Sequence, residues 1–182
     1  MLTLYKSLVQ SILEFNSPVW NPTKVGEIQA IEGVQKTFTS RISALKSDDY
    51  WKRLKEMSLM SLQHRREHYI ILQVCKILKG VSPNNIGLEF CKTPRRGTVA
   101  VTPPLVKGCS QRNQSLYDGS FAVLGARLWN LVPVDIKSLK TFPTFKEKLS
   151  QFLATFPDNP PVRGYSCANS NSLIDWAGAR RL

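Results

Sequence analysis

The chain has few cysteines, and it lacks both a closely spaced cysteine pair and a long hydrophobic run. Its four cysteines include no C-x-x-C pair, so a zinc ribbon or zinc knuckle is not expected. The chain does not open with the basic, apolar and small-residue segments of a secretory signal, so disulfide bonds are not expected either. Lys, Gln or Arg interrupts every apolar stretch well short of the roughly 18 residues that a membrane span needs. These absences predict an intracellular protein of the nucleus or cytoplasm, with reduced thiols and no membrane partner.

Motifs of the common catalytic classes are also scarce. The sequence has no glycine-rich phosphate loop followed by Lys-Ser/Thr and no G-x-S-x-G nucleophile elbow. The segment 64–68 reads HRREH and matches H-x-x-E-H, in which two histidines one helical turn apart share a zinc ion and the glutamate activates water. However, Arg65 and Arg66 place positive charge beside the proposed dication, and a third ligand is not evident. We therefore interpret His64 and His68 as partly exposed residues of a basic helix and predict no metal site.

The pair Asp48-Asp49 has the residue type with which two-metal enzymes hold magnesium. It follows Lys46-Ser47 and precedes Tyr50-Trp51, a context that is typical of a helix start. Two-metal chemistry also needs a further carboxylate on a neighbouring strand, and no strand is evident nearby. The sequence thus predicts no catalytic residue, and it does not favour an enzyme acting alone.

Negative charge is the other scarce property. The chain has 25 Lys and Arg against 13 Asp and Glu, which gives a formal net charge of +12. No acidic residue occurs between Glu89 and Asp118. A surplus of this size predicts attraction to polyanions such as nucleic acid, and a merely soluble basic protein is the alternative.

The hydrophobic pattern predicts a mainly α fold. Apolar residues recur with helical periodicity over 2–15, 22–45, 48–57 and 61–80. In the first helix, we expect the stripe Tyr5, Leu8, Val9, Ile12 and Leu13 to face the core. In the second, we expect Lys24, Glu27, Glu32 and Lys36 to form the exposed face.

These segments predict four regions along the chain. Residues 1–80 should form a helical bundle, and residues 81–119 a basic, Pro- and Gly-rich irregular region with at most a short β element near 99–101. Residues 120–156 should hold two short helices, and residues 157–182 a loosely ordered tail.

The candidate binding residues are basic side chains interleaved with aromatic ones, since Lys and Arg contact phosphates and aromatic faces stack on bases. The candidates are Lys36, Arg41, Lys52, Arg53, Arg65, Arg66, Arg95, Arg96, Lys107, Arg112 and Arg127. If five or six phosphates are neutralised, log affinity should fall with log salt at a slope of roughly −4 to −5. Alternatively, these charges form a solvated face, and Trp20, Trp51 and Trp129 fill the core.

A series of short motifs runs through the chain in order. They read LYKSLVQSILEF (4–15), SPVW (17–20), IEGVQK (31–36), YWKRLKEMSLMSL (50–62), RR (65–66), KILKG (76–80), RLWNLVP (127–133) and FKEKL (145–149). The series resembles the carboxy-terminal region of the reverse transcriptases of LINE-type (non-LTR) retrotransposons, in particular the jockey type. The chain departs from the family's pattern at Gln10-Ser11-Ile12, where Arg-Pro-His is common.

The resemblance implies the thumb and post-thumb segment of an RNA-directed DNA polymerase, with residues 1–80 as a thumb-like bundle. Such a segment grips RNA or DNA through the backbone while the palm performs catalysis. The catalytic aspartates and their magnesium ions belong to the palm, which is missing here, so no cofactor is expected in this segment. The expected partners are nucleic acid and the palm domain. The alternatives are a truncated or decayed mobile-element remnant without biochemical function, or a stand-alone structural or interaction protein.

Overall fold

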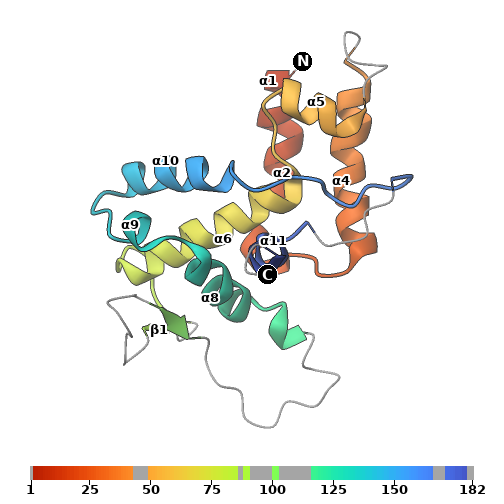
Figure 1. The fold of residues 1–182 in the computed structure, drawn as a ribbon. Helices are drawn as coiled ribbons and strands as arrows, with labels where there is room; N and C mark the ends of the chain where they lie inside the picture. The colour runs from red at the N-terminus through yellow and green to blue at the C-terminus, as the bar shows by residue number, and fades with distance from the viewer. Residues whose placement is uncertain are drawn as a thin grey trace. The chain divides into compact units, whose positions relative to one another are not determined.

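The computed structural model is mainly α-helical, as the sequence predicts, and it describes residues 2–42, 49–85, 88–90, 100–102, 116–165 and 171–179. The chain divides into two compact units (Figure 1). The first unit comprises Met1–Glu67 and Pro157–Arg180, and the second comprises His68–Phe156.

The first unit is built from short helices and from one long helix. They are α1 (Leu2–Leu4), the π-helical turn η1 (Tyr5–Val9), α2 (Gln10–Glu14), α3 (Ser17–Trp20), α4 (Val25–Ser40), α5 (Tyr50–Glu56), the first residues of α6 (Leu62–Leu78), and α11 (Leu173–Ala179). Helix α2 ends at Glu14, and after Phe15 the residue Asn16 adopts a left-handed conformation with φ of 51°. Asparagine tolerates this conformation better than most residues, and Pro18 suits the first turn of α3. The break that the sequence predicts here is therefore observed.

Helix α5 begins where the sequence predicts a helix start. The Asp49 carboxylate accepts a hydrogen bond from the backbone N–H of Tyr50 at 2.8 Å. This contact satisfies one of the N–H groups that a helix leaves unpaired at its beginning. Asp49 is thus a helix cap, as we predicted for this acidic pair.

The core under α5 brings together residues distant in the sequence. Tyr50, Leu54 and Leu59 pack with Val162, and Tyr165 lies against Trp51 with ring centroids 4.3 Å apart. Residues 157–165 therefore return to the first unit and complete its core. This finding differs from the expected loose tail, because Val162 and Tyr165 pack against the apolar side chains of α5.

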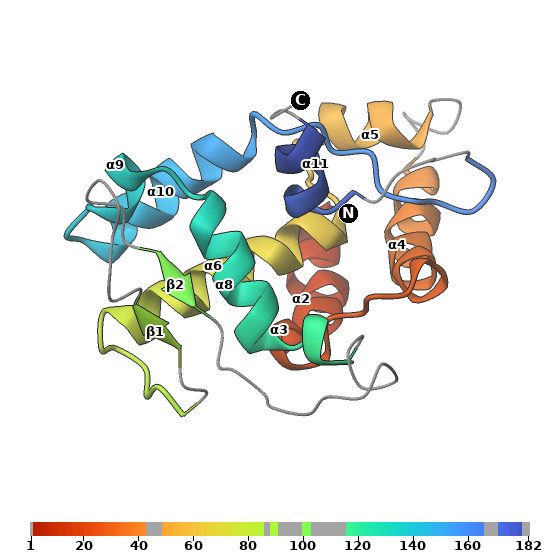
Figure 2. The same ribbon diagram turned by 60° about the horizontal axis from the view of Figure 1, so that its bottom comes forward.

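In the described part of the chain, the second unit packs the later part of α6 with five further elements and a short helical segment at 116–118. They are the strands β1 (Glu89–Phe90) and β2 (Val101–Thr102) and the helices α8 (Phe121–Leu131), α9 (Val134–Lys137) and α10 (Phe142–Leu153). The strands pair antiparallel, with Phe90 opposite Val101 (Figure 2). The Asn130 side chain both donates to and accepts from the backbone of Val101, at 2.9 and 3.0 Å. These two hydrogen bonds attach the strand pair to α8.

The boundary between the units falls inside α6, at 67/68, and not at the expected boundary near residue 80. The reason is that α6 is apolar over more than one face. Residues Leu62 and His64 are buried in the first unit, whereas Ile70, Val74 and Cys75 are buried in the second. Helical periodicity shows that a helix forms, but it does not show with which segments that helix packs.

The first helices bury a different face from the expected one. Tyr5 and Gln10 are buried, whereas the exposed fractions of Leu8 and Ile12 are 60% and 75%. Leu4 and Leu8 on one side, and Tyr5 and Val9 on the other, give this segment two apolar faces, so periodicity alone does not decide between them. The π-helical turn η1 also adds a residue to one turn and shifts the register of everything after it.

In the described part of the chain, no helix combines the length and the apolar character that crossing a membrane requires.

Gly125 gives a direct test of packing in the second unit. A Cβ atom at Gly125 would lie 2.8 Å from Cγ2 of Val74 and 3.6 Å from Cγ2 of Ile70, so α8 and α6 approach each other through the missing side chain. We expect Gly125→Ala to lower the unfolding free energy by about 1–3 kcal/mol through overpacking. Chemical denaturation followed by circular dichroism measures this change.

Gly33→Ala is the matched control, because Gly33 also lies inside a helix and a Cβ there meets nothing within 4 Å. Alanine should stabilise α4 by up to about 1 kcal/mol through helix propensity. Equal effects of the two substitutions would contradict the close approach of α8 and α6.

Candidate functional site

The interior of the first unit contains a hydrogen-bonded network that joins four helices. The Tyr5 hydroxyl donates to Oε1 of Gln35 at 2.8 Å, and Nε2 of Gln35 donates to the Tyr50 hydroxyl at 3.2 Å. The Tyr50 hydroxyl in turn donates to the Glu32 carboxylate. The other Glu32 oxygen accepts from the backbone N–H of Leu62 at 3.0 Å. Glu32 therefore contacts α5 and the beginning of α6 from its place on α4.

Burial dominates the electrostatics of this network. It raises the pKa of Glu32 to about 7, although the hydrogen bond from Tyr50 opposes the shift. Burial, together with the charge of Glu32, also raises the pKa of Tyr50, so its hydroxyl remains a donor. The Tyr50 hydroxyl keeps its proton at neutral pH, and the network is suited to joining helices.

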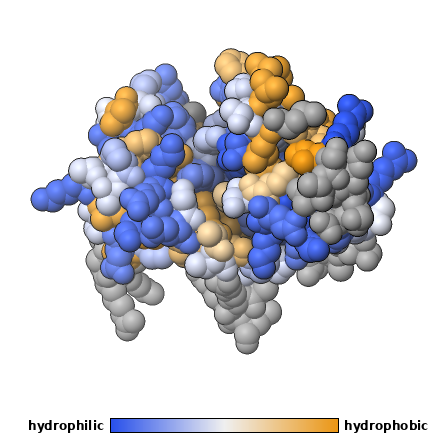
Figure 3. Space-filling model, turned by 90° about the horizontal axis from the view of Figure 1, so that it is seen from above, coloured by the Kyte–Doolittle hydropathy of each residue, from blue (hydrophilic) through white to orange (hydrophobic). Residues whose placement is uncertain are grey.

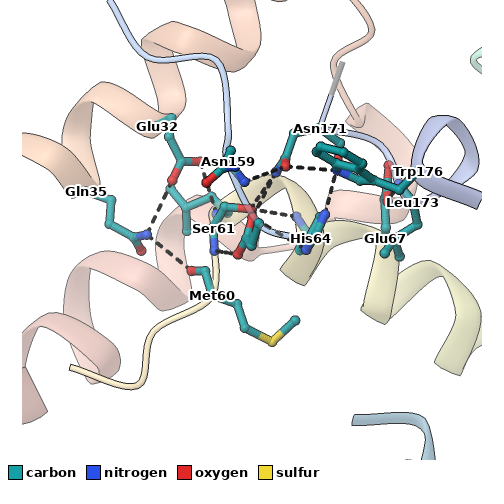
Figure 4. Close-up of polar contacts among 12 residues, drawn as sticks. Glu32, Gln35, Met60, Ser61, His64, Glu67, Asn159, Asn171, Leu173 and Trp176 are labelled. Carbon is teal, nitrogen blue, oxygen red and sulfur yellow. Dashed lines mark hydrogen bonds and ion pairs between the residues drawn. The ribbon is translucent and has the colours of Figure 1, made fainter. Parts of the chain in front are cut away.

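A second buried network, shown in Figure 4, ties the carboxy-terminal residues to the start of α6. The Asn171 amide donates to the Ser61 hydroxyl at 3.2 Å and to the Asp158 carboxylate at 2.9 Å. Asp158 also accepts from the backbone N–H of Ser61 at 2.7 Å. Nε2 of His64 lies 2.8 Å from the carbonyl oxygen of Asn171. These hydrogen bonds hold Asp158 and Asn171 against the N-terminal end of α6.

Glu67 performs a similar task one turn further along α6. Its carboxylate accepts from the backbone N–H of Leu173 at 2.8 Å, which is the first residue of α11. Burial raises the pKa of Glu67 to about 7, against the effect of that hydrogen bond. Glu32 and Glu67 thus each contact the N-terminal end of a helix from a different part of the chain.

Ser61, His64 and Asp158 are the residue types of a hydrolytic triad, but their geometry is different. The Ser61 hydroxyl accepts from the backbone N–H of His64, at 3.1 Å, and from Asn171. Nε2 of His64, which would take the serine proton in a triad, is occupied by the Asn171 carbonyl. All three side chains therefore hold the chain together.

The H-x-x-E-H segment has the same structural character. His64 is buried, because Asn171 and Asp158 enclose it. The expectation that this histidine is partly exposed is therefore wrong. Glu67 is engaged with Leu173, and the ring of His68 stacks on Tyr69 in the second unit. Within the described ranges, no three His, Cys, Asp or Glu side chains gather as they would around a metal ion.

The magnesium chemistry of a polymerase palm does not fit the acidic residues that the structure describes. Asp49 is committed to capping α5, and Asp48 lies outside the described residues. The described carboxylates that are buried, Glu32 and Glu67, accept backbone N–H groups. No catalytic step through a metal is therefore assigned to this chain.

Seven of the candidate nucleic-acid-binding residues are described, and the structure separates them into two groups. Four are buried or engaged in the fold: Lys36, Arg53, Arg65 and Arg66. Three are exposed: Arg41, Lys52 and Arg127. Arg95, Arg96, Lys107 and Arg112 lie outside the described residues.

The side chains of the first group have partners within the fold. Nζ of Lys36 donates to the carbonyl of Arg163 at 3.1 Å and lies 4.4 Å from the ring centroid of Tyr165. Arg53 is buried beside Thr39, and Arg65 forms a bidentate ion pair with Glu14. Arg53 and Arg66 are buried, whereas Lys36 and Arg65 are partly exposed.

The exposed candidates remain available for phosphate contacts. Nζ of Lys52 lies 3.8 Å from Oε1 of Glu56, and Nη2 of Arg127 lies 3.0 Å from Oδ1 of Asp118. Both ion pairs lie on the surface. Exposed ion pairs of this kind contribute little to stability, typically below about 1 kcal/mol. A phosphate group can therefore replace the carboxylate as the partner of the basic side chain.

Sequence reasoning missed the residues of the two networks. It placed Glu32 on the exposed face of its helix, and the structure buries Glu32 completely. A signal was present, since Glu32 and Gln35 lie three residues apart and close to Ile28 and Ile31 on the same helix. Asn171 carried no signal, because its role depends on the return of the chain over more than 100 residues.

Comparison of the chain with protein-family models, with curated proteins and with solved structures gave no match.

The two buried glutamates make stability depend on pH. Their folded-state pKa of about 7 lies above the ordinary 4.5, so the folded state binds more protons than the unfolded state between these values. The stability that these two glutamates contribute is therefore fully present at low pH and is lost as pH rises through 7. We expect each group to lower the unfolding free energy by about 1–3 kcal/mol between pH 5 and pH 8.

Glu67→Gln keeps an oxygen for the Leu173 N–H but cannot ionise, and it should flatten this decline. Glu27→Gln is the control, since Glu27 is an exposed glutamate on α4. Urea denaturation at several pH values measures both variants. A decline as steep in Glu67→Gln as in Glu27→Gln would contradict the assignment.

Proposed function

We propose that this chain is the carboxy-terminal segment of a non-LTR retrotransposon reverse transcriptase. It binds RNA or DNA through the phosphate backbone and performs no catalysis of its own. The catalytic aspartates and magnesium ions would belong to the palm of such an enzyme.

The observation that carries this proposal is where the residues of the resembling motifs lie. Tyr5, Gln35 and Tyr50 come from three motif segments, and one hydrogen-bonded chain joins them. Glu32 belongs to the same segment as Gln35, and it accepts from Leu62 at the end of the third segment. Chance similarity in separate places would not be expected to converge on one buried site. We therefore infer that the motif residues are those that pack together in a single folded unit.

Surface charge supports the binding function. The described residues include many exposed basic side chains in both units: Lys6, Lys24, Arg41, Lys52, Lys55, Lys79, Arg127, Lys140, Lys146, Lys148 and Arg163. With a net charge of +12, such a surface attracts a polyanion without reading its sequence.

The acid-free stretch between Glu89 and Asp118 is the proposed centre of binding. We expect the affinity of the chain for RNA–DNA hybrid, duplex and single-stranded oligonucleotides to fall between 50 and 300 mM salt, with a log–log slope of roughly −4 to −5. Replacing Arg95, Arg96, Lys107 and Arg112 by Gln should make this slope shallower by about 3, because each phosphate contact contributes roughly −0.7 to −0.9. Fluorescence anisotropy measures both.

The matched control replaces Lys6, Lys24, Lys55 and Lys146 by Gln, which removes the same charge from exposed positions elsewhere. It should retain most of the slope. A salt-independent affinity in the unmodified chain would end the binding proposal. Equal losses in the two variants would reduce it to attraction by net charge.

An exposed apolar stripe at the start of the chain supports the second part of the proposal, a palm partner. Leu4, Leu8, Ile12, Phe15 and Val19 have exposed fractions of 59–78%. The spacing of Leu4, Leu8 and Ile12 places these three along one side of the first helices. Figure 3 shows on one face of the molecule how hydrophobic residues interrupt the hydrophilic surface. Exposed apolar area of this kind marks an interaction site or an aggregation hazard. We propose that the palm covers it in the whole polymerase.

The partner test uses the fingers–palm fragment of a jockey-type reverse transcriptase. We expect it to bind this chain, and replacing Leu8, Ile12 and Phe15 by Ser should weaken binding at least about tenfold, since each buried apolar side chain contributes about 1.5–3 kcal/mol. The control replaces Val81, Leu116 and Val134 by Ser, which are exposed apolar residues elsewhere. Absence of binding, or equal loss in both variants, would contradict the palm assignment.

The same stripe is the observation that favours the second candidate, a stand-alone interaction protein or a remnant without its partner. Under this alternative the purified chain binds a hydrophobic dye through the stripe but shows no salt-dependent affinity for nucleic acid. The oligonucleotide titration therefore separates the two candidates.

A further inference from the structure

Arg66 is buried within the first unit, and most of its hydrogen-bonding capacity is unused by the protein. Its exposed fraction is 1%, and Nε donates to the Asn21 side chain at 3.1 Å. Nη1 and Nη2 are buried and have no hydrogen-bond partner among the described residues. Burial lowers the pKa of Arg66, but an arginine keeps its charge in proteins. A buried guanidinium without partners is costly, so something must accept from it.

The neighbouring carboxylates do not fill this role. Glu14, Glu32 and Glu67 act on Arg66 through their charge. However, Glu14 is committed to Arg65, Glu32 to Tyr50 and Leu62, and Glu67 to Leu173. Burial also keeps Glu32 and Glu67 partly protonated near neutral pH. None of the three is a hydrogen-bonding counter-ion for the free Nη groups.

Two further buried groups of the first unit have unused hydrogen-bonding capacity. Nε2 of Gln10 and the hydroxyl of Ser17 are buried and lack partners among the described residues. Gln10 lies one helical turn before Glu14, which contacts Arg65. Ser17 lies between Glu14 and Asn21, both of which contact the Arg65-Arg66 pair. Figures 1 and 2 both show α2 beside the first turns of α6.

From this arrangement, we propose that the first unit binds a small inorganic anion of the halide class, such as chloride, between the start of α6 and the α2–α3 segment. Arg66, Gln10 and Ser17 donate to it. Water would accept from these groups too, but each molecule brings two hydrogens that need acceptors. A halide ion accepts from every donor and brings no hydrogen that needs an acceptor. Because Arg66 and Ser17 are buried, the phosphates of a nucleic acid are not candidates, and this site is separate from the proposed binding surface.

The test is thermal unfolding of the full chain at constant ionic strength, with sodium gluconate replaced stepwise by sodium chloride up to about 200 mM. A ligand that binds only the folded state raises the midpoint with the logarithm of its concentration. We expect a rise of at least about 3 °C. Sodium bromide should act similarly, because bromide has the same charge and a similar size.

Ser17→Ala and Gln10→Leu each remove one donor and should lose at least half of the rise. The controls are Ser11→Ala, whose exposed hydroxyl bonds to its own helix, and Arg41→Met at an exposed arginine. Both controls should keep the full rise. Arg66→Met should abolish it, and if that variant does not fold, the Ser17 and Gln10 variants decide.

Equal midpoints in chloride and gluconate would overturn the proposal and leave water as the acceptor. So would an equal rise in Ser17→Ala, Gln10→Leu and the controls, because the anion would then act on the surface in general. Broadening of the chloride-35 magnetic resonance line by the unmodified chain, and its loss in Ser17→Ala, would support binding directly.

Discussion

The first unit depends on one buried carboxylate. Glu32 projects from α4 and accepts from the Tyr50 hydroxyl on α5 and from the backbone N–H of Leu62 at the start of α6. Removing a carboxylate from water is unfavourable, and the raised pKa of this group records that cost. The penalty is offset because the two contacts fix three helices at once. Gln35 extends the same network to Tyr5, so the first helices are positioned by it as well.

The sequence predicted the elements better than their partners. Periodicity gave the helices, and Asp49 was recognised as a cap from its neighbours. The buried face of the first helices, the role of Glu32 and the boundary within α6 were not predicted. In each case the deciding contact joins segments far apart in the chain, such as Val162 with Tyr50 or Asn171 with His64. Local pattern carries no information about such contacts.

The same distinction divides the basic residues. Arg53, Arg65 and Arg66 look in the sequence like the exposed Lys52 and Arg41, because the charge of a residue does not reveal its partner. The structure places Glu14 against Arg65 and Asn21 against Arg66. The basic residues that look alike in the sequence therefore form two sets. The members of one set contact other parts of the fold, and the members of the other set are exposed and available for the proposed contact with nucleic acid.

If the motif residues act as one cooperative unit, Tyr50 and Glu32 depend on each other. A double-mutant cycle with Tyr50→Phe and Glu32→Leu, measured by chemical denaturation, tests this dependence. We expect a coupling energy of about 1 kcal/mol or more, because Tyr50→Phe removes the donor and Glu32→Leu removes the acceptor of the same hydrogen bond. Effects that add within about 0.3 kcal/mol would show that the two residues act independently and that the motif residues do not form one unit.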